Sequence, residues 1–119
     1  MVSTLALSSV SKAFGSKPVL QNLSLEIANG EFVAVLGSSG SGKTTLLRLI
    51  AGFDDPDAGE ISIAGKLVAS KSVFVAAEAR RVGYVPQDAA LFPHLSVFEN
   101  VAFGLKGLSK SARVDRVRE

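Results

Sequence analysis

The chain has 119 residues, the size of one ordinary domain with one hydrophobic core. Thirteen basic and eleven acidic residues give a net charge of +2, so no strong field favours nucleic acid or an anionic membrane. The absence of cysteine excludes disulfides, thiolate metal sites and cysteine nucleophiles. We see no secretory signal and no apolar stretch near the ~20 residues of a membrane span, so we expect a soluble cytoplasmic protein.

The first thirty residues predict two antiparallel strands. Leu5, Leu7 and Val10 lie in a loosely alternating segment over residues 4–14, which is typical of a half-buried strand. A turn at Gly15–Pro18 follows, and residues 23–27 alternate again before Asn29 and Gly30. Two alternating strands joined by turn residues indicate an antiparallel layer.

The next segment has a different pattern. Residues 32–36 are continuously apolar and β-prone, which predicts a strand buried on both faces, as in a parallel sheet. After it we expect a mostly buried helix over residues 44–53, a turn over 54–59 and a short strand over 60–64. A helical turn over 76–81 and a buried strand over 82–85 follow. The last of these elements is a helix over 96–103, which begins with a capping box of Ser96 and Glu99.

The C-terminal residues predict an unfinished helix. Ser109 is a good N-cap, Val114 and Val117 follow at helical spacing, and no glycine or other stop signal precedes Glu119. We therefore expect residues 109–119 to begin a helix that is cut off.

Residues 37–44, Gly-Ser-Ser-Gly-Ser-Gly-Lys-Thr, fit the phosphate-loop pattern G-x-x-x-x-G-K-[ST]. Glycines let phosphate oxygens approach the backbone, successive amides form an anion nest, and the following helix adds its positive N-terminus. Lys43 supplies a positive charge for the β- and γ-phosphates, and Thr44 supplies a hydroxyl for Mg²⁺. A predicted strand before the motif and a helix after it favour this interpretation over a Gly/Ser linker.

The sequence therefore predicts an α/β fold of the P-loop NTPase class, with an antiparallel β layer beside the nucleotide core. A nucleoside triphosphate and Mg²⁺ are the expected ligands, and the loop alone does not distinguish ATP from other nucleoside triphosphates. The residues expected to bind them around the loop are Ser38, Ser39, Gly40, Ser41, Gly42, Lys43, Thr44 and Thr45.

Four segments in this order resemble the ATP-binding subunit of ABC transporters. They are Val10–Phe14, the phosphate loop, Tyr84–Gln87 and Leu91–Val101, and the likeness extends along essentially the whole chain. Residues 78–84 and the stretch around Phe92 look most like the ATPases of ferric-iron importers. The resemblance implies that residues 1–119 are the N-terminal part of an ATPase domain, truncated before its helical subdomain. It also implies that hydrolysis of ATP by the intact domain drives import.

The resemblance also implies roles for single residues. Phe14 falls where the family stacks an aromatic ring on adenine, although tyrosine is more usual there, and a core phenylalanine is the alternative. Val19 matches a position near the base, and a core role is equally consistent. Gln87 matches the glutamine that reaches toward Mg²⁺ and the attacking water. We therefore expect Lys43 and Gln87 to be catalytic, and Thr44 and Gln87 to contact the metal.

Two further features favour structural interpretations. His94 is the only histidine, and it does not match the family's catalytic histidine, which lies farther downstream. We expect it in a loop near the surface that receives the permease. The acidic residues of the 54–60 segment are interrupted by Pro56 and Gly59, which indicates a solvated turn and not a metal site.

Three motifs of the resembled family are missing from the sequence: the LSGGQ-like signature, the apolar strand that ends in Asp-Glu, and the switch histidine. Phosphoryl transfer depends on positioned groups and charge neutralisation of the kind that these motifs supply in the family. We therefore expect these 119 residues alone to be inactive, while the intact protein hydrolyses ATP. The alternatives are a binding-only fragment or another P-loop ATPase.

The resemblance implies partners and a location as well. It predicts transmembrane permease subunits docked around Phe92–Leu95, a head-to-tail homodimer of the intact protein, and no nucleic acid. It places the protein in the cytoplasm, peripheral on the inner face of the cell membrane.

Overall fold

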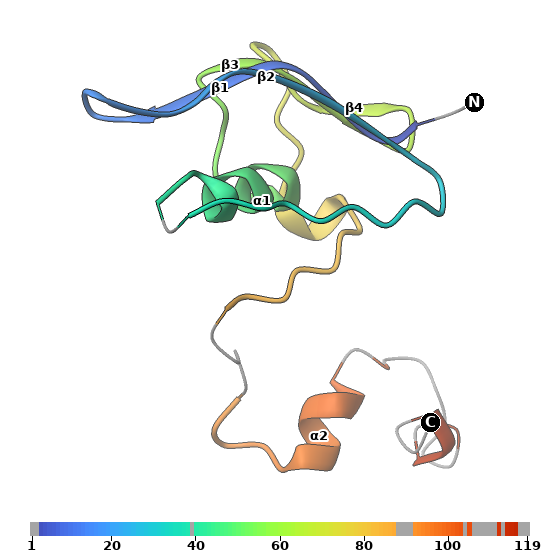
Figure 1. The fold of residues 1–119 in the computed structure, drawn as a ribbon. Helices are drawn as coiled ribbons and strands as arrows, with labels where there is room; N and C mark the ends of the chain where they lie inside the picture. The colour runs from blue at the N-terminus through green and yellow to red at the C-terminus, as the bar shows by residue number, and fades with distance from the viewer. Residues whose placement is uncertain are drawn as a thin grey trace. The chain divides into compact units, whose positions relative to one another are not determined.

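The computed structural model describes residues 3–38, 40–87, 92–103, 105, 112 and 114–116, and the chain divides into two compact units, Met1–Tyr84 and Val85–Glu119. The first unit contains a four-stranded antiparallel sheet (Figure 1). Its strands are β1 (Ser3–Phe14), β2 (Lys17–Ala28), β3 (Ala58–Ile63) and β4 (Lys66–Ala69), in the order β2-β1-β3-β4. The predicted antiparallel pair is thus confirmed as β1 and β2.

A β-bulge explains why the apolar positions of β1 are spaced unevenly. Leu7 pairs with Leu25, the register shifts, and Val10 then pairs with Leu23. Ser9, inside the shift, has a φ of 50°, which is uncommon for a residue with a side chain. One extra residue in the strand moves Val10, and not Ser9, to the buried face, where Val10 is fully buried.

The core of the first unit lies between the sheet and α1 (Lys43–Ala51), as Figure 1 shows. Leu46 and Leu49 of α1 are buried against Leu5 and Leu7 of β1, whereas Leu47 is 46% exposed. The remaining buried members of this cluster are Val10, Ile61, Val68 and Ala69. The helix is therefore buried along one stripe, and not over most of its surface as its composition predicted.

The sequence interpretation missed β4. Ala64 and Gly65 have φ values of 52° and 78°, so they form a two-residue turn in which both residues are left-handed. Ile63 pairs with Lys66 directly across this turn. The signal was an alanine-glycine pair between two apolar segments. The predicted helical turn over 76–81 is present as a short 3₁₀ helix, η1 (Ala77–Ala79).

Two predicted buried strands are not strands in the structure. Residues 31–38 are irregular, and Phe32 and Leu36 are 95% and 91% exposed. Residues 82–85 are also irregular, and Val85 is 90% exposed. A strand of a parallel sheet needs neighbouring strands and helices over both faces. Within the described residues no strand pairs with either segment, so their apolar composition predicted a sheet that these residues do not form.

The second unit contains α2 (Val97–Ala102), which begins with the predicted capping box. The Glu99 amide donates to Ser96 Oγ at 3.1 Å, and the Ser96 amide donates to Glu99 Oε1 at 3.1 Å. This hydrogen bond from the Ser96 amide lowers the pKa of Glu99. Of the helix predicted over 109–119, residues 112 and 114–116 are helical, and the others lie outside the described residues. Across the described part of the chain, no helix has the length and apolar character to cross a membrane.

We expect Ser96→Ala to weaken α2, because the mutation removes the acceptor for the Glu99 amide. Loss of such an N-cap costs about 1 kcal/mol, which corresponds to an approximately fivefold faster hydrogen exchange of the Glu99 amide. Amide exchange followed by NMR measures this directly. Glu99→Gln keeps a side-chain oxygen for the Ser96 amide and is the matched control. Equal exchange in Ser96→Ala and the unmodified chain would contradict the capping role.

Candidate nucleotide-binding site

The phosphate loop leads directly into the N-terminus of α1. The helix begins at Lys43, no described side chain caps its N-terminus, and its first turn carries no acidic residue. The first amides of a helix have no intrahelical acceptor and carry part of the helix dipole. An anion at this end of α1 therefore meets unsatisfied donors and a favourable field.

Glycines give the loop its shape. Gly40 and Gly42 have φ values of 82° and 95°, in the region that only glycine adopts readily. A Cβ on Gly42 would stand 3.1 Å from atoms of both Val19 and Leu20. Gly42 therefore allows the turn and also lets β2 approach the start of α1.

Two hydrogen bonds join groups of the loop and of Lys43 to carbonyls of the loop itself. The Lys43 ammonium donates a hydrogen bond to the Gly37 carbonyl. The Ser41 amide donates to the Ser38 carbonyl at 3.1 Å. Thr44 is exposed and Thr45 is half-buried in the first turn of α1. Ser39 lies outside the described residues. A bound phosphate would compete with the Gly37 carbonyl for the Lys43 ammonium.

Of the two predicted base-contacting residues, Val19 of β2 lies beside this loop, and Phe14 is the last residue of β1. Val19 packs against Gly42, as the close approach of its Cγ1 and carbonyl shows. Phe14 ends β1 and is 51% exposed, so its ring is not a core residue. The Lys12 ammonium lies 5.4 Å from the centroid of the Phe14 ring. An exposed aromatic ring is suited to stacking on a base.

Gln87 belongs to the second unit, and its side chain is exposed. The two units are not placed relative to one another, so the role of Gln87 at Mg²⁺ and water stays a prediction. Thr44, the other predicted metal ligand, lies in the first unit with an exposed side chain.

A polar contact that the sequence interpretation missed joins Asp57 to the hairpin. Asp57 Oδ2 accepts from the Ala13 amide at 2.7 Å, and Asp57 Oδ1 lies 3.5 Å from the Lys12 ammonium. The Asp57 amide in turn donates to the Ser11 carbonyl at 2.9 Å. The Ala13 amide, with a smaller effect from Lys12, lowers the pKa of Asp57. The only sequence signal was a charged pair, Lys12 before Phe14 and Asp57 after α1.

The acidic 54–60 segment is exposed, as predicted, but two of its carboxylates have partners. Asp54 accepts from Arg48 Nε at 2.9 Å, and Asp57 bonds to the hairpin. No cluster of three or more potential metal-ligating side chains occurs among the described residues. Residues 54–57 form neither helix nor strand, as the predicted turn requires, but β3 begins at Ala58, inside the predicted turn.

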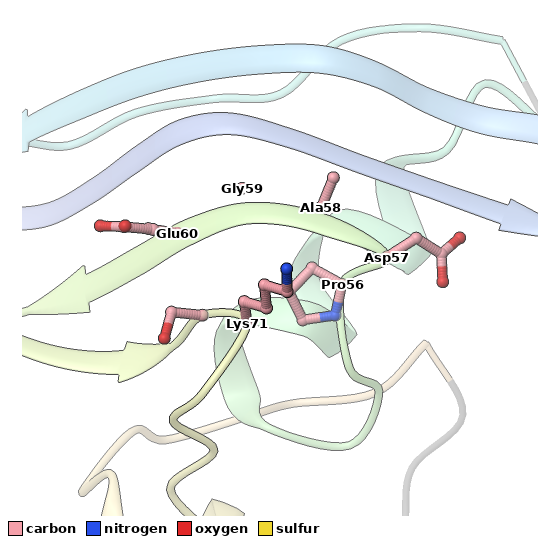
Figure 2. A pocket seen from close by; sticks show the side chains of 7 residues that line it. Pro56, Asp57, Ala58, Gly59, Glu60 and Lys71 are labelled. Atoms are coloured by element: carbon pink, nitrogen blue, oxygen red, sulfur yellow. The ribbon is translucent and has the colours of Figure 1, made fainter.

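A pocket of about 360 Å³ lies beside this segment. Figure 2 shows Asp57 with its carboxylate pointing away from Pro56 and Lys71. Ser70 Oγ, also in the wall, accepts from the amides of its own turn, at 3.1 Å from Val73. The polar groups of the pocket are thus used locally or exposed to solvent, and we assign it no ligand.

The surface predicted to meet a permease lies in the second unit, where Asn100 organises it. Asn100 Oδ1 accepts from the Phe92 amide at 2.9 Å, and its Nδ2 donates to the carbonyls of Leu95 and Ser96 at 3.2 and 2.9 Å. His94 is exposed, and its ring lies 5.8 Å from that of Phe92. Several apolar side chains here remain 40–83% exposed: Phe92, Val97, Phe98, Val101 and Phe103.

A glycine-rich loop that ends in Lys-Thr at an uncapped helix N-terminus, beside a β layer, defines a P-loop nucleotide-binding protein. The family described as "ABC transporter" matches residues 20–119. The chain therefore belongs to the ABC transporter family.

Within this family, the chain is similar to curated import ATP-binding proteins. The Fe(3+) ions import ATP-binding protein FbpC 2 of Pectobacterium atrosepticum is 52% identical over 115 residues, covering 97% of this chain and 33% of that protein. The Fe(3+) ions import ATP-binding protein FbpC of Pseudomonas fluorescens is 49% identical over 118 residues, covering 99% and 33%. The chain thus spans about a third of the length of these relatives.

Solved structures share the fold. A dimeric ATP-binding cassette in a post-hydrolysis state, bound to ADP and phosphate, superposes with a TM-score of 0.80 at 33% identity, covering 96% of this chain and 54% of that one. A bacterial Atm1-family ABC exporter with ATP bound gives a TM-score of 0.78 at 34% identity, covering 92% and 19%. The predicted P-loop fold of the ABC ATPase type is confirmed.

Proposed function

We propose that this chain is the nucleotide-binding part of an ATPase that drives import of ferric iron through a membrane permease. The observation that carries the proposal is the phosphate loop at the uncapped N-terminus of α1, with Val19 packed against Gly42 and Phe14 exposed at the end of β1. The relatives named for Fe(3+) import support the cargo. An anion site with an exposed aromatic ring in the same unit fits a nucleoside triphosphate better than a free phosphate.

The residues of the loop have distinct roles in this proposal. The amides of Ser38–Gly42 and of the first turn of α1 hold the phosphates, and Lys43 neutralises their charge. The exposed Thr44 hydroxyl would hold Mg²⁺, which would neutralise phosphate charge when bound. Phe14 stacks on adenine and Val19 lines the base site. Gln87 orients water at the γ-phosphate.

Residues 1–119 are, in this proposal, the N-terminal part of an ATPase domain, since the chain spans a third of the relatives' length. They bind nucleotide without appreciable turnover, and the intact protein hydrolyses it. The intact protein works as a head-to-tail homodimer on permease subunits at the inner face of the membrane. The dimeric ATP-binding cassette supports the dimer, and the exposed apolar side chains around Phe92 support the permease contact.

The metal contact can be tested at Thr44. Removing its hydroxyl takes one ligand from Mg²⁺, so we expect Thr44→Ala to weaken binding of Mg·ATP about 10-fold. Binding of ATP in EDTA should change little, because the phosphate amides remain. Isothermal titration calorimetry with and without Mg²⁺ measures both affinities.

Thr44→Ser retains the hydroxyl and is the matched control, with expected near-normal affinity. A Thr44→Ala variant that binds Mg·ATP as tightly as the unmodified chain would remove Thr44 from the metal site. Absence of ATP binding by the unmodified chain would contradict the proposed function itself.

A further inference from the structure

Phe14 lies in a hairpin that one carboxylate attaches to the rest of the first unit. The hairpin turn after Phe14 consists of Gly15 and Ser16, which are both exposed. β1 pairs with β3 only as far as Ser11 and Ala58, so Phe14 extends three residues beyond the last paired position. The end of the hairpin that carries the ring therefore has no support from β3. Its support comes from β2 and from the contacts that residues 12–14 make with other segments.

Asp57 makes those contacts. Its amide donates to the Ser11 carbonyl at 2.9 Å, and its Oδ2 accepts from the Ala13 amide at 2.7 Å. The two hydrogen bonds lie on residues of β1 that flank Lys12, so they continue the support of β1 past the end of the β3 ladder. Figure 2 shows the Asp57 carboxylate directed away from Pro56 and Lys71, which leaves it available to the hairpin.

Lys12 completes the arrangement. Its ammonium donates to the Asp55 carbonyl at 2.8 Å, lies 3.5 Å from Asp57 Oδ1, and lies 5.4 Å from the Phe14 ring centroid. The side chain of Lys12 is only 16% exposed, and these contacts hold its ammonium in place. A cation held against the ring fixes its orientation through the ring quadrupole.

We propose that Asp57 and Lys12 are positioning residues that hold the Phe14 ring in place as the stacking surface for the nucleotide base. The inference rests on the proposed function, because it assigns the base to Phe14. Asp57 fixes the backbone on the N-terminal side of Phe14, and Lys12 fixes the ring. The contacts of Lys12 and Asp57 are with residues outside the phosphate loop, so we expect the pair to govern the affinity contributed by the base and not that contributed by the loop.

The test uses Phe14→Trp, which introduces the only tryptophan of the chain and keeps an aromatic ring at this position. Stacking of a base on the indole quenches its fluorescence, so titration with Mg·ATP gives the dissociation constant. Mg·tripolyphosphate, which has no base, is measured by its displacement of Mg·ATP. The ratio of the two dissociation constants reports the contribution of the base separately from that of the phosphates.

In this background we expect Asp57→Ala to weaken Mg·ATP about 2- to 10-fold, the range expected for loss of one aromatic stacking contact, and to leave Mg·tripolyphosphate unchanged. Asp57→Asn retains an oxygen for the Ala13 amide and should recover most of the base contribution. Lys12→Met should partly reduce the contribution of the base to the affinity. Glu60→Ala removes an exposed carboxylate from β3, where Glu60 pairs with Ser8 and not with residues 12–14, and it is the matched control.

The outcomes separate the two proposals. Equal weakening of both ligands by Asp57→Ala, or an unchanged ratio, would overturn the positioning role while leaving the proposed function intact. Failure of the parent Phe14→Trp chain to bind either ligand would overturn the proposed function. If Asp57→Ala fails to fold, Lys12→Met decides, with Asp57→Asn beside it. A ratio of the two dissociation constants in Lys12→Met that equals the ratio in its Phe14→Trp parent would overturn the inference.

Discussion

We expect Arg80→Ala to lower the free energy of unfolding of the first unit by about 3–5 kcal/mol. Arg80 is only 4% exposed, and its guanidinium donates to four backbone carbonyls. The acceptors are Val75 at 2.7 Å, Leu49 at 2.9 Å, Ile50 at 3.2 Å and Val68 at 3.3 Å. Without the guanidinium, these carbonyls lose a charged donor in the interior.

The location of these acceptors explains why the effect is large. Leu49 and Ile50 are in the last turn of α1, where carbonyls lack intrahelical donors and a cation is favoured by the helix dipole. Val68 belongs to β4, so one side chain joins the helix to the sheet. Burial lowers the pKa of Arg80, which nearby Asp55 opposes, but an arginine stays charged at neutral pH.

Urea denaturation of Arg80→Ala, Arg80→Met and Arg81→Ala measures the effect. Arg80→Met keeps the aliphatic volume beside Phe74, whose ring lies 5.1 Å from the guanidinium, and isolates the hydrogen bonds from the packing. Arg81 is exposed, so Arg81→Ala should stay within about 0.5 kcal/mol of the unmodified chain. An Arg80→Met chain as stable as the Arg81→Ala chain would show that the carbonyls do not need the guanidinium.

The importance of Arg80 was not visible in the sequence. Residues 76–81 predicted a helical turn, and the turn is present, but an arginine in such a turn is usually solvated. Gly52 provides the space: a Cβ there would stand 2.8 Å from Arg80 Nε. Two residues separated by 28 positions must be combined to recognise the contact, and local patterns carry no such information.

Local signals were reliable where the stabilising contacts are local. The capping box at Ser96, the phosphate loop and the β1–β2 pair depend on residues close in sequence, and the structure contains all three. The predicted buried strand at residues 32–36 depends on partners elsewhere in a sheet. Hydropathy detects that a segment suits burial, but it does not supply the strands that would bury it.

The candidate site shows the same division. Lys43 and Thr44 were predicted from spacing alone, and the structure places them at the start of α1 as expected. Asp57 was interpreted as part of a solvated turn, because its partner, the Ala13 amide, is 44 residues away in sequence. Backbone donors have no residue-type signature, so a carboxylate that binds one cannot be distinguished in the sequence from a solvated carboxylate.

We expect Lys43→Ala to weaken binding of Mg·ATP between about 10- and 100-fold, because one or more charge-assisted hydrogen bonds of about 1.5–3 kcal/mol are lost. In the structure the Lys43 ammonium donates to the Gly37 carbonyl, so it already lies over the loop. Lys43 is half-buried at the first position of α1, and alanine is favourable in a helix. The substitution should therefore reduce affinity with little change in the free energy of unfolding.

Calorimetric titration with Mg·ATP and with Mg·tripolyphosphate measures the loss, and both ligands should weaken by the same factor. This equality would distinguish the proposed phosphate contact of Lys43 from the proposed base contact of Phe14. Lys66→Ala removes an exposed lysine from the start of β4 and is the matched control for net charge. An affinity for Mg·ATP that is unchanged in Lys43→Ala would falsify the assignment of residues 37–44 as the phosphate site, whatever the likeness of the chain to its relatives.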